Sequence, residues 1–332
     1  MFVPVVNQFQ EPLMPTIPSR AKKWIKSGKA TGFFKKGVFC VRLNKEPSDN
    51  KKQEIVVGID PGSKREGYTV KSTAHTYLNI LSDTVDWVKD SVERRRNARR
   101  TRRNRKTPYR KNRLNRVRGG LPPSTKARWQ LKLRVSRWLV KMFPITTFIV
   151  EDIKAITKGY CKWNKIFSPL QIGKQWFYEQ LKQLGILKLM YGYETKELRD
   201  SLGFKKITNK LAEKFEAHNV DSWVLAYSIV GGVLDNRKII RLFPIQLHRR
   251  QLHVFQSAKN SIRKKYGGTR SLGFSRGSIV KHNKFGITYI GGNSKNRISL
   301  HSIENSDRLT RNVKAEDIKF LTYNSWRIFN VC

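Results

Sequence analysis

The sequence predicts a mixed α/β core with basic insertions, and three observations support this class. Two β-branched runs, 54–60 (EIVVGID) and 146–152 (TTFIVED), have the composition of buried strands, and each ends in an acidic residue. Between residues 129 and 143, apolar side chains recur at a helical spacing. The segment 207–234 predicts a second helix with a strongly apolar C-terminal half. Strands and helices that alternate in this way are typical of an α/β core.

The charge balance predicts a polyanionic partner. The 332 residues include 68 Lys plus Arg against 24 Asp plus Glu, which gives a net charge of +44. A compact domain with this charge would repel itself strongly without a counter-charge. A hydrophobic content of 39%, with 8 Trp, 17 Phe and 11 Tyr, excludes a disordered basic tail. We therefore expect a nucleic acid as the partner, with an anionic membrane surface as the weaker alternative.

Cysteine spacing and hydropathy argue against several other classes. Cys40, Cys161 and Cys332 are far apart in the sequence, so we expect neither a zinc site nor a disulfide framework. The longest apolar stretch, 223–234, is about half as long as a membrane span. The N-terminus lacks the basic start and apolar run of a signal peptide. We expect a reducing compartment, either the cytoplasm in association with the nucleoid or an organelle stroma, and no membrane partner.

The remaining elements of the first ninety residues follow from local signals. Pro12-Leu13-Met14-Pro15 is locally stiff because its prolines fix φ, and 19–30 predicts a short basic helix. A hydrophilic linker covers 44–52. Residues 68–72 predict a strand that forms a hairpin with 54–60, since Pro61-Gly62 provides a turn between them.

An arginine-rich segment, 91–118, follows the hairpin. Of its 28 residues, 14 are Lys or Arg and one, Glu93, is acidic. The arginine spacing places guanidinium groups on all sides of a helix, so such a helix would contact phosphates on more than one side. We expect Pro108 to break or kink this helix and 119–123 (GGLPP) to end the segment. The alternative is a disordered arm that binds any nucleic acid, but the position between two core strands favours the helix.

The candidate nucleic-acid-binding residues are basic side chains of this segment and of a cluster in the C-terminal region. They are Arg94, Arg95, Arg96, Arg99, Arg100, Arg102, Arg103, Arg105, Arg110, Arg113, Arg116, Arg263, Lys264 and Lys265. Five aromatic residues are candidates for stacking on bases, although such side chains more often belong to a core. These are Tyr109, Trp163, Trp176, Phe177 and Tyr178. From residue 236 onward the chain is β-prone and carries 20 basic against 4 acidic residues.

Three carboxylates and a histidine form a candidate metal site. Asp60 and Glu151 each end an apolar strand, and Asp221 lies on an otherwise apolar helix. Buried carboxylates are costly unless a cation meets them, and Mg²⁺ prefers oxygen ligands. Pairs of Mg²⁺ ions held by carboxylates support in-line cleavage of phosphodiesters. His218 precedes Asp221 by three residues and shares its side of the helix, where it could take a proton from the attacking water.

Each of these residues also has a structural interpretation. An aspartate at a strand end, such as Asp60, is more often a turn or cap residue, and Glu151 could equally pair with a nearby arginine. Asp152 competes with Glu151, because alternation along a strand does not by itself decide which of them faces the site. His218 alone would more often be a satisfied surface histidine. Only the conjunction of the four residues indicates a metal site.

The motifs resemble those of RuvC nucleases, which have an RNase H-like fold. Residues 58–62 (GIDPG), 149–153 (IVEDI) and 217–221 (AHNVD) resemble the first, second and third RuvC motifs. The arginine-rich segment resembles the bridge helix of RNA-guided nucleases. Pro12-Leu13-Met14-Pro15 with the following basic helix resembles the PLMP domain of the transposon-borne IscB and IsrB proteins. Segments 263–268 (RKKYGG) and 323–327 (YNSWR) resemble the same group.

One departure from IscB narrows the resemblance. IscB carries an HNH nuclease between its second and third RuvC motifs. Here, 66 residues lie between Glu151 and His218, and none of them is a histidine. An HNH site needs histidines as metal ligand and general base, so none can form there. The chain is therefore similar to IsrB, the HNH-less relative.

This resemblance implies an RNA-guided DNA endonuclease that acts as a nickase. One protein would bind one guide-bearing omega RNA and a target double-stranded DNA, and its RuvC site would cut the displaced non-target strand. Asp60, Glu151 and Asp221 would hold two Mg²⁺ ions, with Mn²⁺ as a substitute, and His218 would activate water. The alternatives are a guide-independent, structure-specific nuclease of the junction-resolvase type and a catalytically silent RNA- or DNA-binding protein.

The resemblance also implies a division of the chain into five parts. They are a PLMP domain (1–50), a first RuvC segment (54–90), an arginine-rich bridge helix (91–120), second and third RuvC segments (121–235), and a β-rich region that contacts RNA and the target-adjacent motif (236–332).

Overall fold

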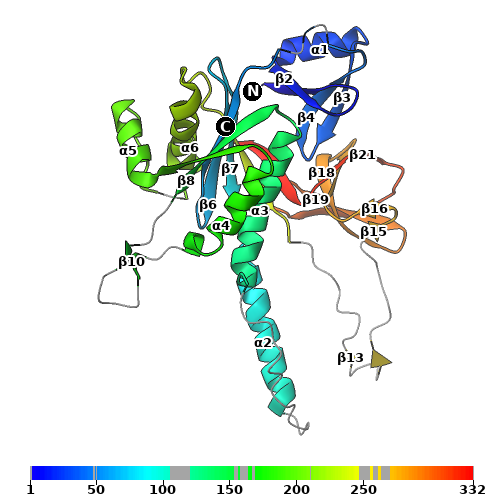
Figure 1. The fold of residues 1–332 in the computed structure, drawn as a ribbon. Helices are drawn as coiled ribbons and strands as arrows, with labels where there is room; N and C mark the ends of the chain where they lie inside the picture. The colour runs from blue at the N-terminus through cyan, green and yellow to red at the C-terminus, as the bar shows by residue number, and fades with distance from the viewer. Residues whose placement is uncertain are drawn as a thin grey trace.

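A seven-stranded mixed sheet with helices on both faces forms the centre of the protein (Figure 1). The computed structural model describes residues 2–47, 49, 51–104, 120–152, 156–157, 164–166, 169–209, 211–246, 255–256, 261–262 and 270–331. The strand order of the central sheet is β11-β8-β5-β6-β7-β12-β22. These strands are β5 (Ile55–Asp60), β6 (Arg65–Lys71), β7 (Thr76–Asp83), β8 (Ile145–Asp152), β11 (Ile186–Tyr191), β12 (Ile239–Pro244) and β22 (Trp326–Val331). The predicted mixed α/β class is confirmed.

The sheet combines a hairpin region with parallel neighbours. Strands β5, β6 and β7 are consecutive and antiparallel. On the other side of β5, strands β8 and β11 run parallel to it, as chain crossovers through helices require. Strand β12 is parallel to β7, and the C-terminal strand β22 is antiparallel to β12. The expected boundary after residue 235 thus precedes a strand that belongs to the central sheet.

Strand alternation divides the core between the two faces of the sheet. Ile55, Val57 and Ile59 of β5 pack in one cluster with α3 (Pro123–Val140) and α4 (Lys174–Lys182). Val56 packs on the opposite face in a cluster with α6 (Phe215–Val230). Helix α5 (Gly192–Ser201) contacts α6 on that same face. Both faces of β5 are therefore buried, which explains its uninterrupted apolar run.

Helix α6 lies unusually close to β5 and β6. A Cβ atom on Gly58 would lie 1.9 Å from the carbonyl oxygen of Ser222, and one on Gly67 would lie 2.6 Å from that of His218. Two glycines on neighbouring strands therefore allow the helix backbone to rest directly on the sheet. Asn219 fixes this contact, because its buried side-chain amide donates to two strand carbonyls at 3.1 and 3.0 Å.

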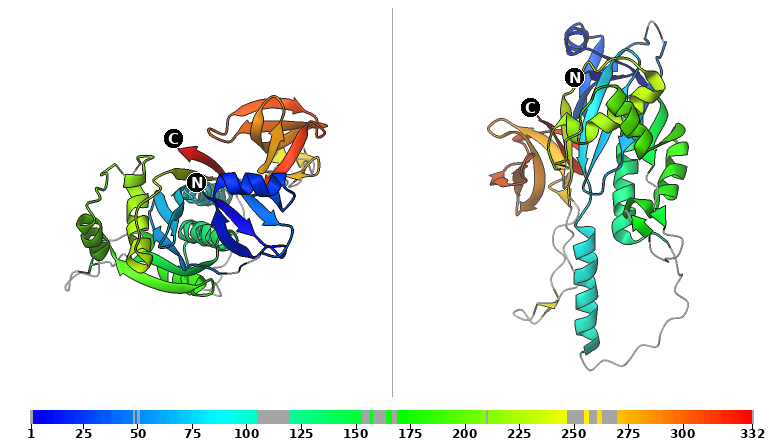
Figure 2. Two further views of the ribbon diagram at one scale, coloured as in Figure 1. Left: turned by 90° about the horizontal axis from the view of Figure 1, so that it is seen from above. Right: turned by 90° about the vertical axis from the view of Figure 1, so that its left-hand side faces the viewer.

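Two smaller sheets flank the centre. The N-terminal sheet has the order β2-β1-β4-β3 and carries α1 (Pro18–Lys26). Its strands are β1 (Val3–Val6), β2 (Pro12–Thr16), β3 (Ala30–Lys35) and β4 (Val38–Leu43). The C-terminal sheet has the order β20-β19-β18-β17-β21 and stands to one side of the central sheet (Figure 2). Its strands are β17 (Ser278–His282), β18 (Gly286–Ser294), β19 (Arg297–Ser302), β20 (Arg308–Val313) and β21 (Ile318–Tyr323).

The arginine-rich segment begins as the helix α2 (Val88–Asn104), which extends away from the sheet as a single rod in both figures. The predicted helix is thus confirmed as far as Asn104. The remaining short elements are β9 (Ile156–Thr157), β10 (Asn164–Ile166), a 3-10 turn at Pro169–Gln171, β13 (Phe255–Gln256), β14 (Ser261–Ile262), β15 (Arg270–Ser271) and β16 (Phe274–Ser275). No helix of the described ranges is long and apolar enough to cross a membrane.

Two predicted helices have different bounds in the structure. The helix expected over 19–30 ends at Lys26, because Gly28 adopts a left-handed conformation (φ 69°) and the chain then enters β3. The helix expected over 207–234 covers 215–230 only. Residues 207–209 and 211–214 lie in loop segments, where the Ile207 N–H donates to the Glu216 carbonyl oxygen, and Gly231 with φ 58° ends the helix.

We predict that Gly58→Ala destabilises the protein by about 3 kcal/mol, since the added methyl group meets backbone rather than a movable side chain. Urea unfolding followed by circular dichroism measures this change. Gly292→Ala is the matched control, because a Cβ there meets nothing within 4 Å. Equal stability of the two variants would contradict the close approach of α6.

Candidate active site

The strands β5 and β8 bring two of the predicted carboxylates together at one edge of the sheet. Val56 and Ile149 both face α6. Because side chains alternate along a strand, Asp60 and Glu151 face α6 as well. The two strands are parallel neighbours with Ile59 opposite Val150, so the carboxylates follow at adjacent positions.

Asp152 faces the opposite side of the sheet. Its carboxylate accepts hydrogen bonds from the Tyr178 hydroxyl at 2.9 Å and from the Lys174 ammonium at 2.7 Å, both from α4. Asp152 thus has a structural contact set of its own. Of the two adjacent acids, Glu151 is the one that lies beside Asp60.

Helix α6 supplies the histidine and the third carboxylate. His218 Nδ1 lies 3.0 Å from Asp60 Oδ2, and both side chains are 8% exposed. Asp221, one turn further along α6, is 2% exposed, and its charge acts on Glu151. The structure therefore brings together all four predicted residues, which are separated by up to 161 positions in the chain.

The pKa values of Asp60 and Glu151 move in opposite directions. Burial opposes ionisation of Asp60, but the hydrogen bond from His218 and the charge of Lys206 outweigh it and lower its pKa. Burial raises the pKa of Glu151 to about 9, with the neighbouring charges of Asp60 and Asp221 and a hydrogen bond to Asp60 as further causes. Neighbouring carboxylates disfavour each other's ionisation, so a nearby positive charge would stabilise their ionised forms.

Two cations absent from the sequence prediction meet Asp221. Arg199 Nη1 of α5 donates to Asp221 Oδ1 at 2.8 Å. The ammonium of Lys206, from the loop before α6, donates to the other oxygen, Oδ2. Burial disfavours the charged form of Lys206, but the charges of Asp60, Asp221 and Glu151 outweigh this and raise its pKa. No sequence pattern distinguishes these two residues among 68 Lys and Arg.

The carboxylates fit a divalent metal ion by their chemistry. Within the described part of the chain, no three His, Cys, Asp or Glu side chains already stand in a metal-holding arrangement. Asp60, Glu151 and Asp221 nevertheless offer the oxygen ligands that Mg²⁺ prefers. The Lys206 ammonium is bonded to Asp221 and interacts electrostatically with Asp60 and Glu151. A positive charge of the chain thus already lies beside one of the carboxylates that would hold a metal ion.

A buried ion pair fixes the turn that follows Asp60. Lys132 of α3 and Glu66 of β6 are both fully buried and bonded to each other. The same ammonium donates to the Gly62 carbonyl oxygen at 3.3 Å, and the Tyr68 hydroxyl donates to Glu66 at 2.8 Å. Gly62 is required in this turn, because a Cβ there would lie 1.4 Å from the carbonyl oxygen of Arg65.

The described part of the arginine-rich helix exposes its basic side chains. Arg94, Arg95, Arg96, Arg99 and Arg100 are exposed along α2, and Arg102 and Arg103 lie on the same helix. The other predicted nucleic-acid-binding residues lie outside the described residues. These are Arg105, Arg110, Arg113, Arg116, Arg263, Lys264 and Lys265.

The candidate stacking aromatics belong to the core where the structure describes them. Phe177 and Tyr178 are buried in the cluster of α3 and α4, and Trp176 packs against it. Tyr109 and Trp163 lie outside the described residues. The core interpretation therefore applies to three of the five.

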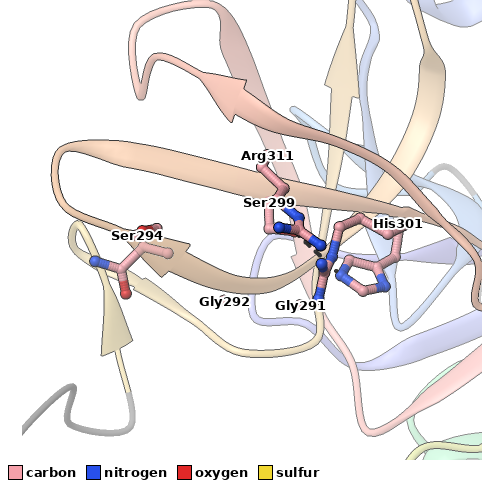
Figure 3. Close-up of a pocket in the computed structure, with 8 residues that line it drawn as sticks. Gly291, Gly292, Ser294, Ser299, His301 and Arg311 are labelled. Carbon is pink, nitrogen blue, oxygen red and sulfur yellow. Dashed lines mark hydrogen bonds between the residues drawn. The ribbon is translucent and has the colours of Figure 1, made fainter.

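A separate basic hollow of about 360 Å³ lies on the C-terminal sheet (Figure 3). Figure 3 shows Ser299, His301 and Arg311 grouped together, apart from Ser294. Gly291 is required beside them, because a Cβ there would lie 2.3 Å from His301 Nε2. The lining also includes Arg308 but no acidic residue, so the hollow is suited to an anion.

We predict that the metal-free protein loses stability as the pH rises from about 4.5 to about 9. The folded state keeps a proton on Glu151 that the unfolded chain has already released near the ordinary value of 4.5. Glu151→Gln has no such proton to release. The free energy of unfolding of this variant should therefore increase relative to that of the wild type as the pH rises. Urea unfolding in EDTA between pH 5 and pH 9 measures the difference, and parallel curves would contradict it.

Comparisons with known proteins bear on parts of the chain. Residues 3–160 match the family model described as RRXRR protein, a span that includes Asp60, Glu151 and the arginine-rich segment. No curated protein matches the chain. Among solved structures, the chain is similar to the crystal structure of the yeast mitochondrial Holliday junction resolvase Ydc2. The identity is 14%, the match covers 54% of this chain and 78% of that chain, and the TM-score is 0.26.

Proposed function

We propose that the protein is a Mg²⁺-dependent, RNA-guided DNA endonuclease that nicks the displaced strand of its target. The observation that carries this proposal is the convergence of Asp60, Glu151, His218 and Asp221 at one sheet edge. These residues come from the three segments that resemble RuvC motifs. The conjunction of three carboxylates with one histidine suits hydrolysis of a phosphodiester.

The strand arrangement supports a RuvC-type, RNase H-like core. Three consecutive antiparallel strands, β5 to β7, are continued on the free side of β5 by two parallel strands, β8 and β11. This is the arrangement that the resemblance implies. It places the first and second motifs on adjacent strands and leaves the third to a helix across the sheet face.

Each residue of the site has a role in the proposed reaction. Asp60, Glu151 and Asp221 would hold Mg²⁺, which would supply Lewis-acid stabilisation of charge on the phosphodiester. The pKa of Asp60 is lowered, so its ionised carboxylate accepts from His218 Nδ1, and the neutral ring then has Nε2 as its proton acceptor. In this tautomer, His218 takes the proton of the attacking water, and Asp60 orients the ring.

The charge distribution supports a permanent RNA partner. A net charge of +44 fits a ribonucleoprotein better than a transient DNA binder. Exposed arginines occupy several sides of α2, which suits a helix between two nucleic-acid backbones. The match to the RRXRR family model covers this helix and the first two motifs. Guide pairing would then read sequence, while the protein reads shape.

The test uses the protein purified together with the transcript that flanks its gene. We expect a copurifying RNA of defined length and Mg²⁺-dependent cutting of the displaced strand in an R-loop with separately labelled strands. Asp60→Ala should reduce the nicking rate at least about 100-fold, because several kcal/mol of charge stabilisation are lost. Target binding should stay within about twofold of the wild type.

The matched control for this test is Asp152→Asn, which alters a buried carboxylate that faces α4 instead of the site. It should retain nicking. Cutting of branched DNA without RNA would favour the resolvase alternative. Binding without any cutting by the wild type would favour the silent binding protein.

A second prediction concerns α2. Replacing Arg94, Arg95, Arg96, Arg99 and Arg100 with Gln should keep the helix, since the two residue types have similar helix propensities. Each phosphate contact contributes about 0.9 to the slope of log K against log salt, so the slope should fall by about two to four. Filter binding at several salt concentrations measures it. Replacement by Lys should retain the slope, and an unchanged slope in the Gln variant would exclude α2 from the interface.

A further inference from the structure

The Lys206 side chain forms an ion pair with one of the three carboxylates of the candidate active site. Its ammonium is bonded to Asp221 Oδ2 and interacts with both Asp60 and Glu151. Asp221 is 2% exposed, whereas the Lys206 side chain is 30% exposed. The lysine therefore enters the acidic site from the solvent side, and water can reach the rest of its side chain.

The backbone on either side of Lys206 is anchored. The Phe204 ring packs edge-on against Trp223 of α6, with 5.3 Å between the ring centroids. The Ile207 N–H donates to the Glu216 carbonyl oxygen at 3.0 Å. Departure of the ammonium from the carboxylates therefore needs only rotation of the flexible four-carbon side chain, without movement of the loop.

Arg199 contacts the same carboxylate in a different way. It projects from α5, is 12% exposed, and its guanidinium also lies 3.4 Å from Asp200. Its bond is to Asp221 Oδ1, whereas Lys206 takes Oδ2. One cation is thus held on a helix by two acids, and the other reaches the site on an extended side chain.

We propose that Lys206 is a resident counter-ion that occupies the place of a divalent metal ion in the metal-free protein and leaves when that ion binds. Arg199 remains in place and acts as a positioning residue for Asp221. This inference rests on the metal site of the proposed function. It adds that the chain itself supplies the charge that allows three carboxylates to be buried together before any metal arrives.

This exchange couples metal binding to the nucleic acid. The metal ion that takes this place has to displace a charge-assisted hydrogen bond, so Lys206 weakens metal binding to the free protein. The displaced ammonium is near the solvent and can bind a backbone phosphate of the strand at the site. By linkage, phosphate binding by Lys206 and metal binding by the carboxylates then favour each other.

The test measures Mn²⁺ binding to the full-length protein through its thermal unfolding midpoint, without any nuclease assay. Asp60→Asn is the control, because any shift of its unfolding midpoint with Mn²⁺ comes from ions bound outside the candidate active site. We expect Lys206→Met to lower the half-saturating Mn²⁺ concentration about tenfold or more, because the ion no longer competes with a charge-assisted bond. Lys206→Arg should bind Mn²⁺ as weakly as the wild type does, and Lys205→Met, which changes the exposed neighbour, should also match the wild type.

Arg199→Gln tests whether any gain in Mn²⁺ affinity comes from removing the Lys206 ammonium that the ion displaces or simply from removing a positive charge near the site. It also removes one positive charge beside Asp221, but the proposal expects no gain in Mn²⁺ affinity, since Asp221 loses its positioning contact. If both variants gained affinity equally, or if Lys206→Met titrated as the wild type does, the proposal would be overturned. If Lys206→Met is unfolded without metal, Mn²⁺ should restore its folding, and failure to do so at any concentration also overturns it.

The outcome also distinguishes this inference from the proposed function. If Mn²⁺ shifted the unfolding midpoint of the wild type and of Asp60→Asn equally, the result would contradict both the metal site and the proposed function. If the wild type responded to Mn²⁺ and Asp60→Asn did not, while Lys206→Met had the same half-saturating concentration as the wild type, only the role of Lys206 would be overturned.

Discussion

The close contact of α6 with strands β5 and β6 is the constraint on which the rest of the site depends. Gly58 and Gly67 leave no side chain between the helix backbone and the sheet. As a result, His218 comes within 3.0 Å of Asp60, although 157 residues lie between them in the chain. A bulkier residue at either glycine would separate the helix from the strands, and with it the histidine from its carboxylate.

Charge compensation is the second constraint. Three carboxylates meet in a largely buried site, where burial and mutual repulsion raise the pKa of Glu151 to about 9. Lys206 and Arg199 offset this repulsion from the open side and from α5. Across the whole chain the repulsion is between positive charges, since the net charge is +44. The protein thus keeps a small acidic centre within a strongly basic chain.

Much of the fold and the candidate site follows from local sequence signals, but some parts do not. The strands that end at Asp60 and Asp152 were predictable because both are apolar runs buried on two faces. The helix expected over 207–234 was too long. Apolar periodicity does not reveal that the chain before the helix is a loop, whose Ile207 N–H donates to the Glu216 carbonyl oxygen at the helix start. Strand β11 and helices α4 and α5 escaped prediction.

By itself, the sequence determined the α/β class and the basic character of residues 91–118, and it predicted Asp60, His218, Asp221 and either Glu151 or Asp152 as one group. These follow from composition, periodicity and motif spacing, which are local properties of the chain. Only the tertiary structure decided that Glu151 rather than Asp152 faces α6, because the face of a strand is set by the packing around it. It alone also placed Lys206 against Asp221, since contacts between distant segments arise from folding and leave no mark on local sequence.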